Sequence, residues 1–159
     1  MRALLAHAQA PPAQLIADGK LLVAEAPDPA PGPGQVLVRV EAAGLNPFDV
    51  KKLSGIFGAG EELPYTPGVD ASGTVAALGE GVEGLAVGDA VLGFFGRTPG
   101  TFAQYAVVDA GPYLARRPEG LDAVRAAAIP LAGIMAKTLL RVAGLEAGHA
   151  GPEGRHAGP

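Results

Sequence analysis

The clearest alternation of apolar and polar positions in the chain runs over residues 35–43. Val36, Val38 and Val40 form one row of this segment, and the intervening positions include charged side chains. Because successive side chains of a strand point to opposite faces of a sheet, a period of two places the valines on one face. The segment therefore predicts a strand in a sheet with one buried face.

Shorter apolar segments elsewhere predict a fold built mainly from strands. Glycine and proline, 24 and 15 of the 159 residues, separate these segments at turn-like intervals. The small residues of the segment that begins at Gly68 suit a tightly curved corner of a barrel. The further strand segments are 1–7, 68–78, 91–95 and 101–108, with a second short apolar run at 21–25.

One short helix is predicted after the strand at 35–43. Asn46 is a favourable N-cap residue, and Pro47 suits the first helical position because its ring fixes the backbone near helical values. Residues 48–54 then form the helix, and Gly55 closes it.

The pattern changes at Asp122, where helical propensity replaces strand alternation. Residues 122–129 are rich in alanine, and Pro130 begins a second helix that runs to about residue 143. The last residues, 149–159, carry no periodicity and are expected to form a disordered tail. The apolar positions of the second helix recur at helical spacing: Leu131, Ile134, Met135, Leu139 and Val142.

Residues 79–84 match the letters G-x-G-x-x-G of a dinucleotide-binding turn. That turn requires a helix directly after it, because the diphosphate binds at the helix N-terminus. Residues 85–89 are instead a turn signal too short for a helix, and Glu80 and Glu83 would repel a phosphate. We therefore interpret the segment as a structural turn.

Composition and charge narrow the classes of partner. The formal net charge is −4 and no basic run exists, which disfavours nucleic acid and anionic membranes as partners. The chain has no cysteine, so it has no disulfide and no thiolate metal site. No apolar run approaches the ~20 residues of a membrane span. We expect a soluble, cytoplasmic protein.

Several segments, in their order along the chain, resemble one protein family. The sequence is similar to the N-terminal, GroES-like domain of medium-chain dehydrogenases/reductases, and among them to the zinc-free quinone oxidoreductase branch. The order of the segments is more specific than any one of them. They are A-x-G-x-N-x-x-D in 42–50, P-Y-x-P-G-x-D in 63–70, V-G-D-x-V in 87–91, G-x-x-A-x-Y in 100–105 and A-A-x-P-L-A-G in 127–133.

The resemblance implies a mainly β fold with flanking helices. It places a partly open, GroES-like β-barrel over residues 1–121 and connecting helices over 122–148. In the family these helices lead into a nucleotide-binding Rossmann domain, for which no strand or glycine-rich turn can be found after residue 148. We expect residues 149–159 to be an aberrant or truncated end, produced by a frameshift, an early stop or a cloning boundary.

The resemblance also bears on zinc. In the alcohol dehydrogenase branch a cysteine stands at the position of Asn46, and histidine and glutamate stand at the positions of Val69 and Asp70. Zinc needs about four nitrogen, sulfur or oxygen ligands, and one aspartate does not hold it. We therefore expect neither a catalytic nor a structural zinc.

By resemblance, the chemistry is hydride transfer from NADPH to a quinone or enone. The resemblance places Asn46 and Met135 near the cofactor, and Phe57, Tyr65 and Phe94 along the substrate. It assigns no catalytic residue. Each residue also has a structural interpretation: Asn46 as a helix cap, Met135 and Phe94 as core, and Phe57 and Tyr65 as loop packing.

Two functions from different classes stay open. The first is the substrate-side domain of an NADPH-dependent, zinc-independent quinone or enone oxidoreductase, inactive alone because the nucleotide-binding half is absent. The second is a free-standing GroES-like binding or assembly module without catalysis. The exposed helix face with Leu131, Ile134, Met135 and Leu139 predicts self-association, as a homodimer or as aggregates.

Overall fold

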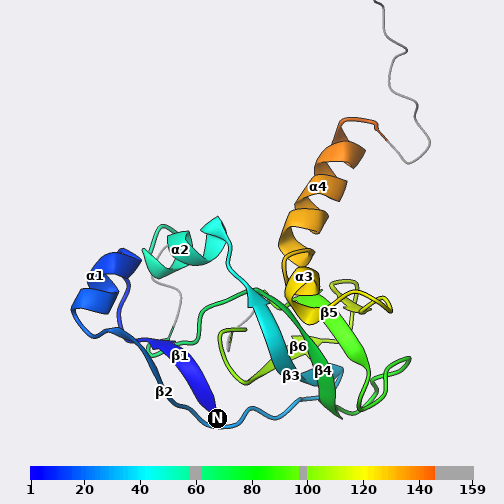
Figure 1. Ribbon diagram of the computed structural model, residues 1–159, viewed down its shortest axis with the longest axis horizontal. Helices are drawn as coiled ribbons and strands as arrows, with labels where there is room; N and C mark the ends of the chain where they lie inside the picture. The colour runs from blue at the N-terminus through cyan, green and yellow to red at the C-terminus, as the bar shows by residue number, and fades with distance from the viewer. Residues whose placement is uncertain (58–61, 97–99, 146–159) are drawn as a thin grey trace, which may run out of the picture.

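The computed structural model describes residues 1–57, 62–96 and 100–145 (Figure 1). Within them the chain forms two antiparallel sheets and a few short helices. The strands are β1 (Arg2–Ala6), β2 (Leu21–Glu25), β3 (Gln35–Gly44), β4 (Asp70–Leu78), β5 (Ala90–Phe94), β6 (Tyr105–Asp109) and β7 (Leu114–Arg116). The helices are α1 (Pro12–Ala17), α2 (Pro47–Leu53), α3 (Ala123–Ala127) and α4 (Pro130–Val142).

The larger sheet has the strand order β6-β3-β4-β5-β7, and the sheets do not close into a barrel. Its inner face carries the main core, which includes Val36, Val38 and Val75. The valine row predicted from sequence is therefore confirmed as the buried face of β3. Register shifts between β3 and β4 show bulges, which add local bend and twist to the sheet.

A smaller unit lies at one end of the molecule (Figure 1). It consists of the β1–β2 pair with α1 and α2, and its own core contains Ala6, Leu15, Leu53 and Tyr65. The N–H of Leu4 donates to the carbonyl oxygen of Phe102 at 2.8 Å, which ties β1 to the segment before β6.

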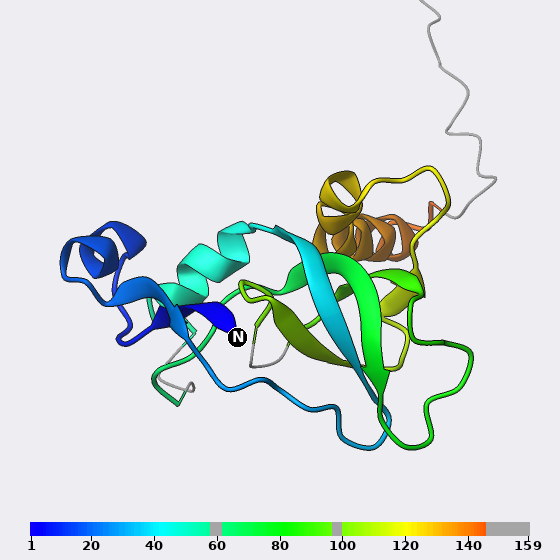
Figure 2. The same ribbon diagram turned by 60° about the horizontal axis from the view of Figure 1, so that its bottom comes forward.

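Helix α3 and the start of α4 lie over the outer face of the larger sheet (Figure 2). Asp70 and Ala71 are consecutive in β4 and so point to opposite faces. Ala71 belongs to the main core, whereas Asp70 contacts the start of α4. From there α4 projects away from the sheet, and Pro130 is the one residue it buries (Figure 1).

Much of the predicted order is confirmed. The segments at 1–7 and 68–78 contain β1 and β4, those at 35–43 and 91–95 match β3 and β5 to within one residue, and the helices after Asn46, Asp122 and Ile129 are present. Residues 79–84 form turns with no helix after them in 85–89, as predicted.

Three details differ from the sequence prediction. Helix α1 and strand β7 were not predicted, and β6 begins at Tyr105 rather than at Thr101. Thr101 and Phe102 instead bind the segment before β4, because their N–H groups donate to the carbonyl oxygens of Gly68 and Pro67. The expected tail at 149–159 lies outside the described residues.

Candidate functional site

Asp70, the first residue of β4, receives hydrogen bonds from two helices. It is 1% exposed. The side-chain amide nitrogen of Asn46 donates to Asp70 Oδ2 at 3.0 Å. The backbone N–H of Leu131, in the first turn of α4, lies 3.1 Å from each carboxyl oxygen. One carboxyl group thus joins the start of α2 to the start of α4.

The local sequence explains why Asn46 can serve two purposes. Asn46 is the N-cap of α2 with extended backbone, and Pro47 occupies the first helical position. The Asn46 N–H donates to Asp49 Oδ2 at 2.7 Å, which is one half of a capping box. The backbone therefore fixes the start of the helix while the side-chain amide nitrogen reaches Asp70.

Asp49 and Asp70 are both buried acids, and their pKa values follow from that. Burial raises the pKa of Asp49 above its ordinary value, against the lowering effect of the Asn46 N–H. Burial also raises the pKa of Asp70, against the hydrogen bonds from Asn46 and Leu131, and the nearby charge of Asp49 adds to the rise. Asp49 Oδ1 has no hydrogen-bond partner among the described residues.

Phe94 lies next to Asp70 across the sheet. The two residues are register partners in the β4–β5 pair, so their side chains share the outer face. The Phe94 ring packs edge-on against Tyr113 with centroids 6.1 Å apart. Both rings line a cavity of about 350 Å³. We call Asn46, Asp49, Asp70, Phe94 and the first turn of α4 the Asp70 cluster.

Met135 is one helical turn beyond Leu131 on α4 and is 50% exposed. Of the five residues assigned by resemblance, the structure joins Asn46 to Asp70 by a hydrogen bond, pairs Phe94 with Asp70 across the sheet, and places Met135 one turn along the helix that begins at Asp70.

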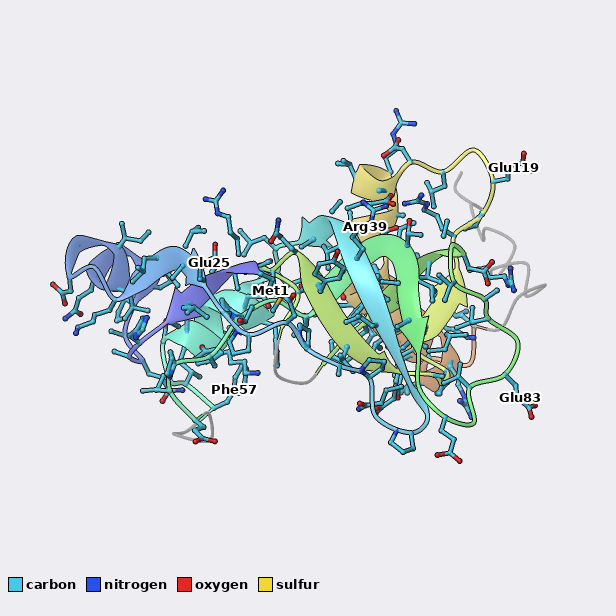
Figure 3. The ribbon with its side chains drawn as sticks, turned by 90° about the horizontal axis from the view of Figure 1, so that it is seen from below. Met1, Glu25, Arg39, Phe57, Glu83 and Glu119 are labelled. Carbon is cyan, nitrogen blue, oxygen red and sulfur yellow. The ribbon has the colours of Figure 1, made fainter. Side chains whose placement is uncertain are left out.

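The other two assigned residues lie in the smaller unit. Phe57 is 59% exposed and stacks on Phe48 of α2, with centroids 5.0 Å apart. Figure 3 shows Phe57 on the same side of the molecule as Met1 and far from Glu83. Tyr65 is buried in the core of the smaller unit, with Lys52 Nζ 5.7 Å from its ring centroid. It lines a different cavity, of about 610 Å³.

Asp49 and Asp70 were not assigned to the cofactor or the substrate from the sequence. The spacing Asn46-x-x-Asp49 was the available signal for the capping pair. The apolar neighbours Val69 and Ala71 were a signal that Asp70 is buried. Nothing in the sequence pointed to Tyr113 as the partner of Phe94.

Two kinds of feature are missing from the described residues. They contain no group of three or more histidine, cysteine, aspartate or glutamate side chains placed to hold a metal ion. They also contain no helix long and apolar enough to cross a membrane.

Residues 32–119 match the sequence profile of the alcohol dehydrogenase GroES-like domain. The chain belongs to that family. The GroES-like domain accounts for more than half of the chain, from the turn before β3 to the loop after β7. Its placement among the medium-chain dehydrogenases/reductases, with quinone oxidoreductases as relatives, is confirmed.

Three relatives show the range of the similarity. The 2-methylene-furan-3-one reductase of Solanum lycopersicum is 38% identical over 122 residues, covering 72% of this chain and 31% of that protein. The quinone oxidoreductase of Coxiella burnetii has a TM-score of 0.77 and 30% identity, covering 93% of this chain and 46% of the other. A mycobacterial protein complexed with NADPH has a TM-score of 0.76 and 31% identity, covering 89% and 40%. The GroES-like chain therefore spans less than half the length of both solved relatives.

Proposed function

We propose that this GroES-like chain is the substrate-side domain of an NADPH-dependent, zinc-independent reductase of quinones or enones. The observation that carries the proposal is that Asn46 and the start of α4 both donate to Asp70, whose register partner in β5 is Phe94. The names of the relatives support the reaction class, since they include a quinone oxidoreductase and an enone reductase. The proposal keeps the cytoplasmic location expected from the sequence.

The residues of the Asp70 cluster fit the nicotinamide end of the cofactor. The Asn46 side chain donates to Asp70 through its nitrogen, and its oxygen has acceptor capacity for a carboxamide N–H. None of the cluster side chains is basic, so the phosphates would be held by another part of the assembled enzyme.

The cofactor, when bound, supplies the hydride that reduces the conjugated carbonyl. The chain's own residues orient the reactants and exclude water. Asn46 orients the carboxamide, and the rings of Phe94 and Tyr113 give the cavity at the end of β5 an apolar wall. Because the chain spans less than half of its solved relatives, we propose that it has no measurable reductase activity by itself.

The test is a titration of the ¹⁵N-labelled chain with NADPH, followed by NMR. We expect weak binding, with chemical-shift changes confined to Asn46, Phe94 and the first turn of α4. Asn46→Ala should abolish these changes, whereas Gln14→Ala, an exposed change in α1, should not. A titration that leaves these signals unchanged would reject the proposal and favour the free-standing binding module.

A further inference from the structure

The backbone of Asp70 is held from both sides by the sheet. Asp70 pairs with Gly44 of β3 and with Phe94 of β5, so it sits in a central strand. Central strands are among the least mobile parts of a fold, because every ladder hydrogen bond is protected. The carboxyl group of Asp70 is therefore a fixed reference point on the outer face.

Helix α4, in contrast, has few other contacts that set its direction. Pro130 is its single buried residue, and the positions from Met135 to Val142 are exposed. Side-chain packing of an apolar stripe normally fixes a helix on its neighbours, and α4 lacks such packing beyond its first turn. The bond from the Leu131 N–H to Asp70 lies in that turn.

The same carboxyl group also sets which way the Asn46 amide faces. An ionised carboxylate only accepts hydrogen bonds, so Asn46 must turn its nitrogen toward Asp70. Its oxygen then lies on the side of the amide away from Asp70, at the start of α2, where the side chain belongs to the capping box. A flip of the Asn46 amide would place its oxygen against the oxygen of Asp70, and the hydrogen bond would be lost.

We propose that Asp70 is a positioning residue: it fixes the Asn46 amide and the direction of α4 relative to each other. Asn46 and Met135 are the two residues assigned to the cofactor, and they belong to the two helices that Asp70 joins. This inference rests on the proposed function for its purpose, while the positioning itself can be measured without any cofactor.

The test compares three variants of the ¹⁵N-labelled chain with the wild type. Asp70→Ala removes the carboxyl group, and Asp70→Asn keeps its shape and one acceptor oxygen. Ser72→Ala is the matched control, since Ser72 is buried two residues along the same strand and bonds to Val91 and Arg117 instead. Amide hydrogen exchange at Leu131, residual dipolar couplings of α4 and the side-chain amide signals of Asn46 are the readouts.

We expect Asp70→Ala to speed exchange at Leu131 at least tenfold, to reduce the residual dipolar couplings of α4, and to shift the Asn46 side-chain signals. Asp70→Asn should speed exchange at Leu131 by a smaller factor and shift the Asn46 side-chain signals. If Asp70→Ala does not fold, Asp70→Asn is the variant that tests the proposal. Ser72→Ala should leave all three readouts at wild-type values. Wild-type exchange and couplings in both Asp70 variants would overturn the proposal.

A parallel NADPH titration of the same samples separates this inference from the proposed function. Loss of the NADPH response in Asp70→Asn, with the wild type and Ser72→Ala still responding, supports both. Altered α4 couplings together with a wild type that does not respond to NADPH supports the positioning role and rejects the proposed function.

Discussion

At the scale of single residues, the unusual feature is a pair of buried acids joined through one asparagine. Asn46 donates its backbone N–H to Asp49 and its side-chain nitrogen to Asp70. Burial raises the pKa of both acids because the charged form loses hydration. Groups with raised pKa values make the stability of the native state fall as pH rises above their unfolded value.

Asp49→Asn should therefore change the pH dependence of stability. The native state of the wild type binds the Asp49 proton more tightly than the unfolded state, so the free energy of unfolding falls as pH rises above 3.8. The variant cannot titrate there and should show a smaller fall. Urea denaturation at a series of pH values between 4 and 7 measures the free energy of unfolding of both proteins, and the linkage relation connects its slope to the proton bound by Asp49. Identical pH profiles of variant and wild type would contradict the expectation.

At the scale of elements, the chain depends on a close approach between β3 and α3. A Cβ added at Gly44 would collide with the backbone carbonyl oxygen of Ala127 and approach Asp70 Cβ to 3.1 Å. Ala127 is the last residue of α3 and lies just before α4. The position of both helices over the sheet therefore requires a glycine at the end of β3.

Gly44→Ala should lower the free energy of unfolding by about 1–3 kcal/mol, the usual range for overpacking. Gly133→Ala is the matched control, because it lies on an exposed part of α4 where an added Cβ meets Ile129 at 3.4 Å. There the change should raise stability by about 0.5–1 kcal/mol through helix propensity. Chemical denaturation of the two variants checks both signs.

The core of the smaller unit offers a second comparison. Leu15 is 1% exposed and Ile16, its neighbour in α1, is 64% exposed. Leu15→Ala should lower the free energy of unfolding by about 2–5 kcal/mol, because it leaves a cavity between α1 and Leu53. Ile16→Ala should stay within about 0.5 kcal/mol of the wild type. Equal effects of the two changes would show that this core does not hold the unit together.

The elements that sequence reasoning predicted are those with local signals. Asn46, Pro47 and Gly55 mark both ends of α2, and the valine row marks β3. Helix α1 was not predicted because a pair of prolines, Pro11 and Pro12, is typical of a chain break, although Pro12 suits the first helical position. The contacts of the Asp70 cluster were not predicted for a different reason. Asp70 bonds to Asn46 and Leu131 at sequence separations of 24 and 61, and no local sequence pattern encodes contacts at such separations.

At the scale of the whole molecule, α4 exposes an apolar row. Met135, Leu139 and Val142 recur at helical spacing, and all three are exposed. Rows of this kind promote association, because burying them removes apolar surface from water. The self-association expected from the sequence stays a prediction, and this row is the surface on which we expect it, since Leu131 and Ile134 are half-buried.

Leu139→Lys should weaken self-association at least tenfold by placing a charge in the centre of that row. Ile16→Lys is the control at matched exposure, 64% against 63% for Leu139, at the other end of the molecule. Sedimentation velocity over a range of protein concentrations measures both. A wild type that stays monomeric at the highest concentration would remove the basis for the prediction.

The contacts of β1 impose an order of events on the newly made chain. The N–H of Gln104 donates to the carbonyl oxygen of Arg2, and Ala3 pairs with Ala103, so the N-terminal strand docks on a segment about a hundred residues later. Likewise β3 needs β6, which is made after β4 and β5. Chains with such distant pairings fold slowly, because loop closure precedes the stabilising contacts. During synthesis from the N-terminus, the first strand to leave the ribosome is among the last to reach its place.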